Sequence, residues 1–96
     1  MLFRSPHSEA ISFQIPCNDQ NEIDKYWNLL LADGGQESQC GWLKDKFGVS
    51  WQVTSPKMND WLGGSDAAGA ERATKAMLGM RKIDLATMEA AYLSNS

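Results

Sequence analysis

The sequence predicts an α+β fold in which one helix covers one face of a small, mostly antiparallel sheet and further helices follow. Residues 10–16 and 49–54 alternate apolar and polar side chains, which is typical of half-buried strands. Residues 20–32 instead repeat apolar side chains every three or four positions, as an amphipathic helix does. The stretches 67–80 and 85–93 have a similar helical spacing. Both kinds of periodicity in one short chain favour a mixed fold.

The length and composition favour a single domain with a modest core. The chain has 96 residues, of which 43% are hydrophobic and four are Trp, so we expect most of it to be ordered. Its formal net charge of −3 provides no basic surface for nucleic acid. No apolar run reaches the length of a membrane span, and no secretory signal pattern is present. We therefore expect a cytoplasmic protein that binds neither nucleic acid nor membrane, with Cys17 and Cys40 as reduced, partly buried thiols.

The first predicted strand covers residues 10–16. It places Ile11, Phe13 and Ile15 on one face and small or polar residues on the other. The proline that ends this stretch cannot donate a backbone hydrogen bond and fits the end of a strand. The preceding residues, 1–9, lack periodicity, and we expect them to form a mobile arm.

A helix is predicted from Gln20 to Ala32. Asp19 is placed to cap its first turn, and Glu22, three residues later, completes a variant of the capping box. The apolar stripe of the helix consists of Ile23, Tyr26, Trp27 and Leu30. We expect Gly34-Gly35 to end the helix through a left-handed residue, a conformation that glycine adopts at little cost.

The stretch from Gly41 to Thr54 predicts a hairpin. Asp45–Gly48 is its turn, because Asp accepts local backbone hydrogen bonds and Gly tolerates positive φ. Residues 36–40 are few and polar, so any strand before the hairpin is very short, and the element order is β-α-(β)-β-β. The apolar residues of the last strand are Val49, Trp51 and Val53. We expect them to pack under the helix and to bury Phe13 and Trp27 there.

Three helices are predicted in the C-terminal part, at Met58–Leu62, Ala67–Met80 and Leu85–Leu93. Asp66 or Ser65 can cap the second helix and Asp84 the third. The apolar stripes of these two helices consist of Ala70, Ala73, Met77, Met80, Leu85, Met88 and Tyr92. We expect these stripes to exceed what the core of one chain absorbs, which would leave part of them for a second copy.

Several segments together resemble one known family. The hairpin sequence GWLKDKFGVSWQV, residues 41–53, is similar to a segment of the PhnB-like family, which is also called the 3-demethylubiquinone-9 3-methyltransferase domain family. Residues 10–15, 22–27 and 80–85 resemble the same family, and the likeness extends over residues 9–92. The family belongs to the vicinal oxygen chelate superfamily, with glyoxalase I and the bleomycin-resistance proteins.

The resemblance implies one glyoxalase-like β-α-β-β-β module, similar to the family's C-terminal module. Within a single domain of residues 1–96, residues 10–55 would form this module and residues 56–96 a C-terminal helical extension. In the superfamily, two modules pair around one cup-shaped site, and metal-dependent members hold the ion with a His on the first strand and a Glu on the last. Ala10 and Gln52 stand at those two positions. A methyl group cannot coordinate a metal, and a neutral amide is a weaker ligand than a carboxylate, so we expect no metal and no cofactor.

The same alignment places a set of mostly small or polar side chains in the cup. These candidate ligand-binding residues are Ser12, Gln14, Trp42, Ser50, Gln52 and Thr54. Such side chains can orient a small molecule by hydrogen bonds. A solvated sheet face or a wet seam between two copies would show the same residues. No catalytic residue is identified.

Three functional hypotheses follow from these residues and the resemblance. The first is a metal-free glyoxalase- or bleomycin-resistance-like protein that binds a small molecule as a homodimer, because a lone module leaves a sheet edge and a concave face uncovered. The second is an enzyme, either the methyltransferase of the family's description or a metal-assisted lyase or dioxygenase. The third is a structural half or fragment of a two-module protein.

Overall fold

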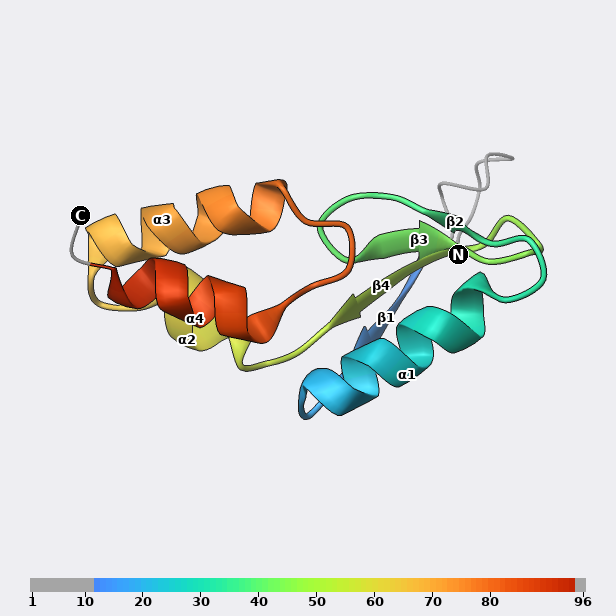
Figure 1. Ribbon diagram of the computed structural model, residues 1–96, viewed down its shortest axis with the longest axis horizontal. Coiled ribbons are helices and arrows are strands. Elements are labelled where there is room, and N and C mark those ends of the chain that lie inside the picture. The colour runs from blue at the N-terminus through green and yellow to red at the C-terminus, as the bar shows by residue number, and fades with distance from the viewer. Residues whose placement is uncertain (1–11, 95–96) are drawn as a thin grey trace, which may run out of the picture.

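The computed structural model describes residues 12–94, which form a four-stranded sheet and four helices (Figure 1). In chain order the elements are β1 (Ser12–Pro16), α1 (Gln20–Leu31), β2 (Gln36–Glu37), β3 (Trp42–Lys44), β4 (Ser50–Thr54), α2 (Met58–Leu62), α3 (Ala67–Leu78) and α4 (Leu85–Leu93). The predicted α+β fold class is confirmed. Ala10, Ile11 and the expected arm at residues 1–9 lie outside the described residues.

The sheet has the strand order β1-β4-β3-β2. β1 runs parallel to β4, with Ser12 opposite Ser50 and Pro16 opposite Thr54, whereas β3 is antiparallel to both of its neighbours. The sheet is therefore mostly antiparallel, as predicted. β2 has only two residues, which agrees with the short polar stretch seen before the hairpin. β1 and β2 form the two edges of the sheet.

The turn between β3 and β4 forms where the sequence predicts it. The Asp45 Oδ1 atom accepts hydrogen bonds from the backbone N–H groups of Phe47 and Val49, at 2.9 and 3.0 Å. Gly48 has a φ of 83° and donates its N–H to the Asp45 carbonyl at 2.9 Å. The Trp51 indole Nε1–H also donates to the second carboxylate oxygen, Asp45 Oδ2, at 2.9 Å. One carboxylate thus fixes both the turn and the start of β4.

Helix α1 begins with the predicted cap. The Asp19 Oδ1 atom accepts the Glu22 N–H at 3.0 Å, and the Glu22 carboxylate accepts the N–H of Asn18 at 2.8 Å. The reciprocal bond of the capping box therefore reaches the residue before the cap. Gly34 of the predicted glycine pair has a positive φ of 113°, but the first residue with a positive φ after the helix is Asp33, at 61°. Aspartate tolerates the left-handed region better than most residues.

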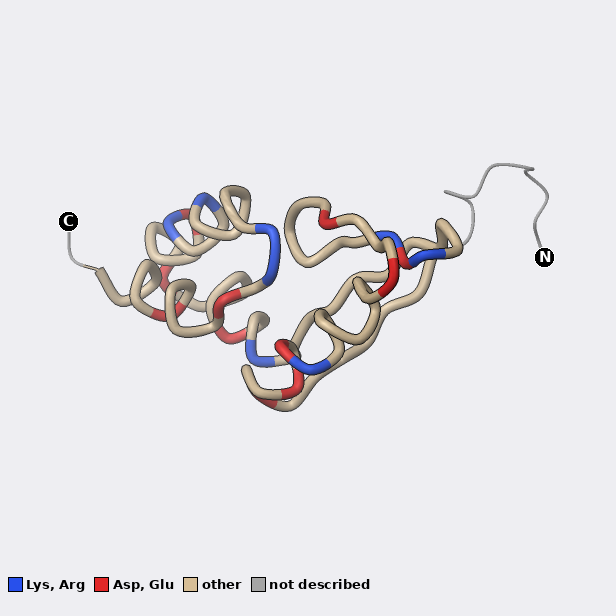
Figure 2. Tube along the Cα trace, turned by 45° about the vertical axis from the view of Figure 1, so that its right-hand side comes forward, with Lys and Arg blue, Asp and Glu red and all other residues tan. Residues whose placement is uncertain are grey.

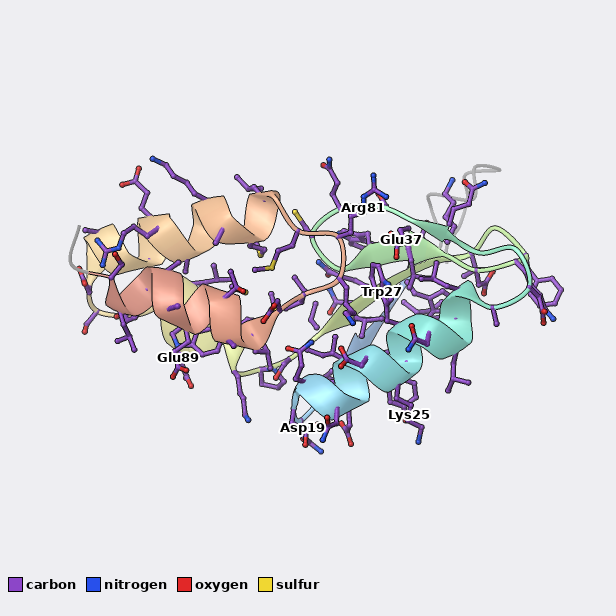
Figure 3. The ribbon with its side chains drawn as sticks, viewed as in Figure 1. Asp19, Lys25, Trp27, Glu37, Arg81 and Glu89 are labelled. Carbon is purple, nitrogen blue, oxygen red and sulfur yellow. The ribbon has the colours of Figure 1, made fainter. Side chains whose placement is uncertain are left out.

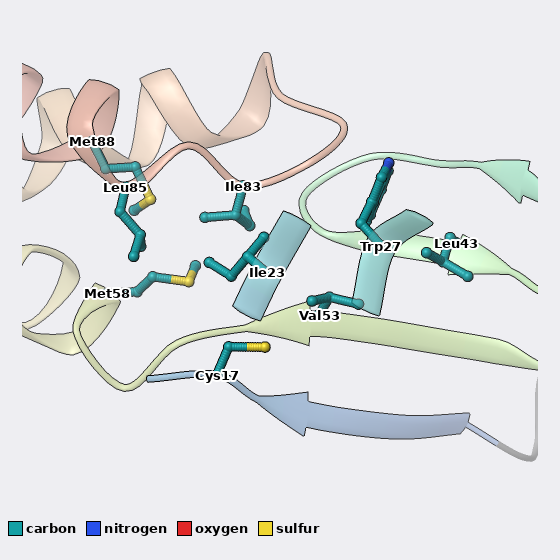
Figure 4. Packing of buried hydrophobic residues seen from close by; sticks show 9 residues of the cluster. All are labelled: Cys17, Ile23, Trp27, Leu43, Val53, Met58, Ile83, Leu85 and Met88. Carbon is teal, nitrogen blue, oxygen red and sulfur yellow. The ribbon is translucent and has the colours of Figure 1, made fainter. Parts of the chain in front are cut away.

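The core lies between α1 and the sheet and continues toward the C-terminal helices (Figure 4). Its buried residues are Cys17, Ile23, Trp27, Leu43, Val53, Met58, Ile83, Leu85 and Met88. Trp27 is only 2% exposed, as predicted. Its indole Nε1–H donates to the Glu37 carboxylate at 3.2 Å, and Glu37 pairs with Arg81 at 3.4 Å (Figure 3). The polar atom of the buried indole is therefore satisfied.

Phe13 is not buried, which corrects the prediction. Its side chain is 48% exposed, and its ring lies 5.0 Å from the Trp51 ring, centroid to centroid. The predicted face is right, since Phe13 and Trp51 are partners in the register of β1 and β4. However, α1 packs over β3 and β4, and β1 lies at the edge beyond them. An apolar residue on the inner face is therefore left half uncovered.

The apolar stripes of the C-terminal helices pack within the chain. Ala73 and Met88 are fully buried and Leu85 is nearly so, while Met77 and Met80 pack against the main core. Helices α3 and α4 lie against each other, and α2 contacts both (Figure 1). The expectation that these stripes exceed the core of one chain is therefore wrong for most of their residues.

Side-chain and backbone bonds tie this helical part to the sheet-bearing part. The Gln20 amide donates to the Ile83 carbonyl at 2.9 Å and accepts the Leu85 N–H at 2.8 Å. Lys82 and Asp24 form an ion pair at 2.9 Å. Asp84 caps α4 as predicted, since its Oδ1 atom accepts the Thr87 N–H at 3.2 Å. Asp66 is the cap residue of α3, without a capping side-chain bond.

Candidate ligand-binding site

The face of the sheet that points away from α1 carries the predicted cup residues. Leu43 and Val53 face α1 and are buried. Because side chains alternate along a strand, the residues next to Leu43 and Val53 in the chain point to the opposite face. The register then places all six predicted residues on this uncovered face: Ser12, Gln14, Trp42, Ser50, Gln52 and Thr54. The tube of Figure 2 shows no charged residue along β1 or β4.

A cavity of about 300 Å³ lies at one end of this face. It is lined by Gln14, Pro16, Gln52, Thr54, Ser55, Pro56, Met58, Asn59 and Leu62. We call it the strand-end cavity, because it lies where β1 and β4 end together. The structure thus brings Gln14, Gln52 and Thr54 into one lining. Ser12 and Ser50 lie at the opposite ends of the same strands, and Trp42 lies on β3.

The sequence patterns do not predict the part of the lining that follows β4. Ser55 is buried, and its hydroxyl oxygen accepts the Lys57 N–H at 3.2 Å, while its carbonyl accepts the Met58 N–H at 3.0 Å. These bonds turn the chain directly from Thr54 into α2. The feature of the sequence that indicates this part of the lining is the short connection, because only three residues separate the end of β4 from α2. A helix joined so closely has to lie beside the strand ends.

A chain of amide hydrogen bonds crosses the cavity lining. Gln14 Nε2 donates to Gln52 Oε1 at 3.1 Å, and Gln52 Nε2 donates to the backbone carbonyl of Cys40 at 3.2 Å. A carbonyl oxygen only accepts hydrogen bonds. The nitrogen of the Gln52 amide must therefore face Cys40, and its oxygen must face Gln14. A glutamate at position 52 would have no proton for the Cys40 carbonyl at neutral pH.

These contacts do not fit a divalent metal ion of the kind that the superfamily implies. Both ends of the Gln52 amide are engaged, and its outward atoms are neutral. Within residues 12–94, no group of three or more His, Cys, Asp or Glu side chains is arranged to hold an ion. Ala10, the other position implied by the resemblance, lies outside that range. We therefore derive no chemistry through a metal at this site.

The residues that line the strand-end cavity contain no group that titrates near neutral pH. Such a lining can bind and orient a ligand, but its own side chains cannot act as a general acid or base. The shifted groups lie elsewhere. The Trp51 indole N–H, aided by the turn N–H groups, lowers the pKa of the Asp45 carboxyl. Burial, followed by the charges of Glu22 and Asp19, raises the pKa of the Cys17 thiol.

A second, smaller cavity of about 180 Å³ lies beside the hairpin turn. Its lining consists of Leu29, Leu30, Ala32, Asp33, Asp45, Lys46 and Phe47. Asp33 and Lys46 form an exposed ion pair at 3.7 Å. None of the predicted cup residues takes part in it.

Part of the chain matches a known family. The family model described as 3-demethylubiquinone-9 3-methyltransferase matches residues 3–54. No curated protein matches the chain. The matched range ends with the last residue of β4, so it includes all four strands and α1 but none of α2, α3 and α4. The strand-end cavity is therefore lined from both sides of this boundary.

Proposed function

The chain belongs to the 3-demethylubiquinone-9 3-methyltransferase family, and from this premise we propose that it is a metal-free, glyoxalase-like member that binds a small molecule as a homodimer. The observation that carries the proposal is the strand-end cavity, whose volume of about 300 Å³ is at the lower end of the range for ligand sites. Polar groups of the cavity come from the part of the sheet that the family model matches, at Gln14, Gln52 and Thr54. Proline, Met and Leu side chains supply the apolar wall.

Binding without methyl transfer fits the lining better than the activity in the family's description. S-adenosylmethionine, the usual methyl donor, carries a carboxylate, an ammonium and a sulfonium group. The strand-end cavity has no charged side chain to pair with any of them, and unpaired charges are costly to desolvate. The donor therefore does not fit this cavity.

Two free thiols, Cys17 and Cys40, support the further proposal of a reducing, cytoplasmic location.

A cavity-blocking variant tests the binding proposal. Asn59→Trp places a large side chain in the cavity wall, whereas Asn28→Trp places the same side chain on the exposed outer face of α1. With benzyl alcohol as a small amphipathic probe, saturation-transfer NMR should give a signal for the wild-type chain and Asn28→Trp. Asn59→Trp should lose it. An equal signal from all three proteins would reject the cavity as the site.

The proposed dimer rests on the free edge of β1. The Cys17 N–H donates to the Thr54 carbonyl at 2.7 Å, on the β4 side. Since N–H groups alternate along a strand, those of Ser12 and Gln14 point away from the sheet. Within residues 12–94, no strand pairs with this edge. The other edge, β2, is short and carries Glu37, which is how edges are commonly blunted.

A two-fold axis beside Phe13 would use this edge fully. Two antiparallel β1 strands centred there would pair Ser12 with Gln14 of the partner subunit, and each of these residues has an N–H to donate. The half-exposed Phe13 rings of the two copies would then face each other. Pro16, which has no N–H, would lie outside the central pairs. Such a contact is isologous, the commonest arrangement in soluble homo-oligomers.

Light scattering of two charge variants tests the dimer. Phe13→Asp places two carboxylates against each other at the proposed axis, whereas Phe47→Asp changes a phenylalanine that is 79% exposed in the hairpin turn. We expect wild type and Phe47→Asp to have twice the chain mass of 10.6 kDa and Phe13→Asp to have the single mass. A wild-type mass near 10.6 kDa at all micromolar concentrations would end the dimer proposal.

A further inference from the structure

The strand-end cavity presents only uncharged polar groups to a ligand. Its side chains are amides, hydroxyls and apolar groups, and neither Lys57 nor Asp60 of the adjoining chain is part of the lining. A charged ligand would lose water and gain no opposite charge here. Burying an unpaired charge costs far more than burying a hydrogen-bonded neutral group. The lining therefore favours a neutral ligand.

Gln14 is the polar group with unused hydrogen-bonding capacity in a defined orientation. Because the Cys40 carbonyl fixes the Gln52 amide, Gln52 Oε1 faces Gln14 and takes one of its N–H groups. The second N–H and the Oε1 atom of Gln14 have no partner among residues 12–94. Gln14 is also exposed, so both groups are accessible from the cavity. One donor and one acceptor on the same planar group are thus presented to a ligand.

The cavity wall on the α2 side is apolar, and this determines the rest of the ligand's chemistry. Met58 and Leu62 of α2, with Pro16 and Pro56, offer an apolar surface. The Thr54 hydroxyl and the Asn59 amide have no side-chain partner in the described part of the chain and supply further neutral polar contacts. A ligand that fits has an apolar body on the α2 side and a polar group on the β1 side. Helix α2 lies outside the range that the family model matches. The ligand's apolar body would therefore contact a part of the chain that this family model does not cover.

We infer that the strand-end cavity selects an uncharged molecule that carries a carboxamide or lactam on an apolar body, and that Gln14 reads the amide. This inference rests on the proposed binding function. The ligand's carbonyl accepts the free N–H of Gln14, and the ligand's N–H donates to Gln14 Oε1. The amide is the complementary group because it also carries one donor and one acceptor side by side. A carboxylate of the same shape lacks the donor and adds an unpaired charge.

Benzamide and benzoate form the matched probes for this inference, because they differ in charge and in the N–H donor but hardly in shape. Titrations followed by the ¹H–¹⁵N spectrum at pH 7 give the Kd of each compound and report on the side-chain amide of Gln14. We expect benzamide to bind at least about tenfold more tightly than benzoate. Gln14→Met should weaken benzamide binding by about fivefold. Gln39→Met, which changes an exposed glutamine in the loop before β3, should leave it unchanged.

The outcomes separate this inference from the proposed function. Benzoate binding as tightly as benzamide to the wild-type chain would overturn the inference without the use of any variant. Unchanged benzamide binding by a folded Gln14→Met chain would overturn it as well. In both cases, the proposed function still stands if benzyl alcohol shifts the resonances of Thr54 and Asn59, which line the cavity. If none of the three compounds shifts these resonances, both the inference and the proposed function fail.

Discussion

Truncating Trp27, Phe13 and Phe47 to alanine should destabilise the protein in the order of their burial. Trp27 is 2% exposed and its indole N–H bonds to Glu37 at 3.2 Å. Replacing a buried Trp by Ala removes its transfer free energy and leaves a cavity, so Trp27→Ala should cost about 3–5 kcal/mol. Phe47, at 79% exposed, should cost less than about 0.5 kcal/mol.

Phe13 lies between these limits. Full burial of a Phe side chain contributes about 1.5–3 kcal/mol, and about half of this one is buried, since it is 48% exposed. The ring contact with Trp51 at 5.0 Å adds about 0.5–1 kcal/mol. Phe13→Ala should therefore cost about 1.3–2.5 kcal/mol in a single chain, less than the cost expected for a fully buried ring.

Urea unfolding followed by circular dichroism measures all three losses. The Phe13→Ala series is extrapolated to low protein concentration, where a second copy no longer contributes to stability. A loss below about 1 kcal/mol for Trp27→Ala, or equal losses for Trp27→Ala and Phe47→Ala, would refute the packing of α1 on the sheet.

Three further predictions concern the turn, the thiols and a tight loop. The pKa of the Asp45 carboxyl is lowered, mainly by the Trp51 indole N–H. The stability that this carboxylate contributes is therefore complete above the ordinary pKa and is lost as the pH falls through the lower pKa of the folded state. The indole N–H resonance should titrate below pH 3.8, and a midpoint at or above 3.8 would contradict this. Cys40 should react with a thiol reagent before Cys17, which is fully buried with a raised pKa; equal rates by mass spectrometry would contradict that burial. Gly41→Ala should cost about 1–3 kcal/mol by urea unfolding, because φ is 84° and the added Cβ lies 2.9 Å from a β4 carbonyl oxygen; a loss under about 0.5 kcal/mol would contradict it.

Local patterns in the sequence predict most of the fold. The alternation along β1 and β4 predicts the two faces of the sheet, and Asp19 and Asp84 predict the starts of α1 and α4, as the structure has them. These features depend on residues that are close together in the chain, where spacing determines geometry.

Long-range placement is what the sequence does not predict. A period of two assigns Phe13 to the inner face but does not say that β1 is an edge strand beyond the reach of α1. Likewise, helical spacing predicts α2 but not that Asn59 closes a cavity with Gln14, 45 positions earlier. The parallel pairing of β1 with β4 is what brings Gln14 and Pro16 beside the part of the lining that β4 and α2 supply.

We expect this chain to bind a small neutral ligand between the uncovered face of the sheet and α2. The most direct test is the measurement of intermolecular nuclear Overhauser effects from the ring protons of bound benzamide. We expect contacts with the methyl groups of Leu62, which lines the strand-end cavity from α2. Contacts with Leu29 and Phe47, which line the smaller cavity beside the hairpin turn, would contradict it.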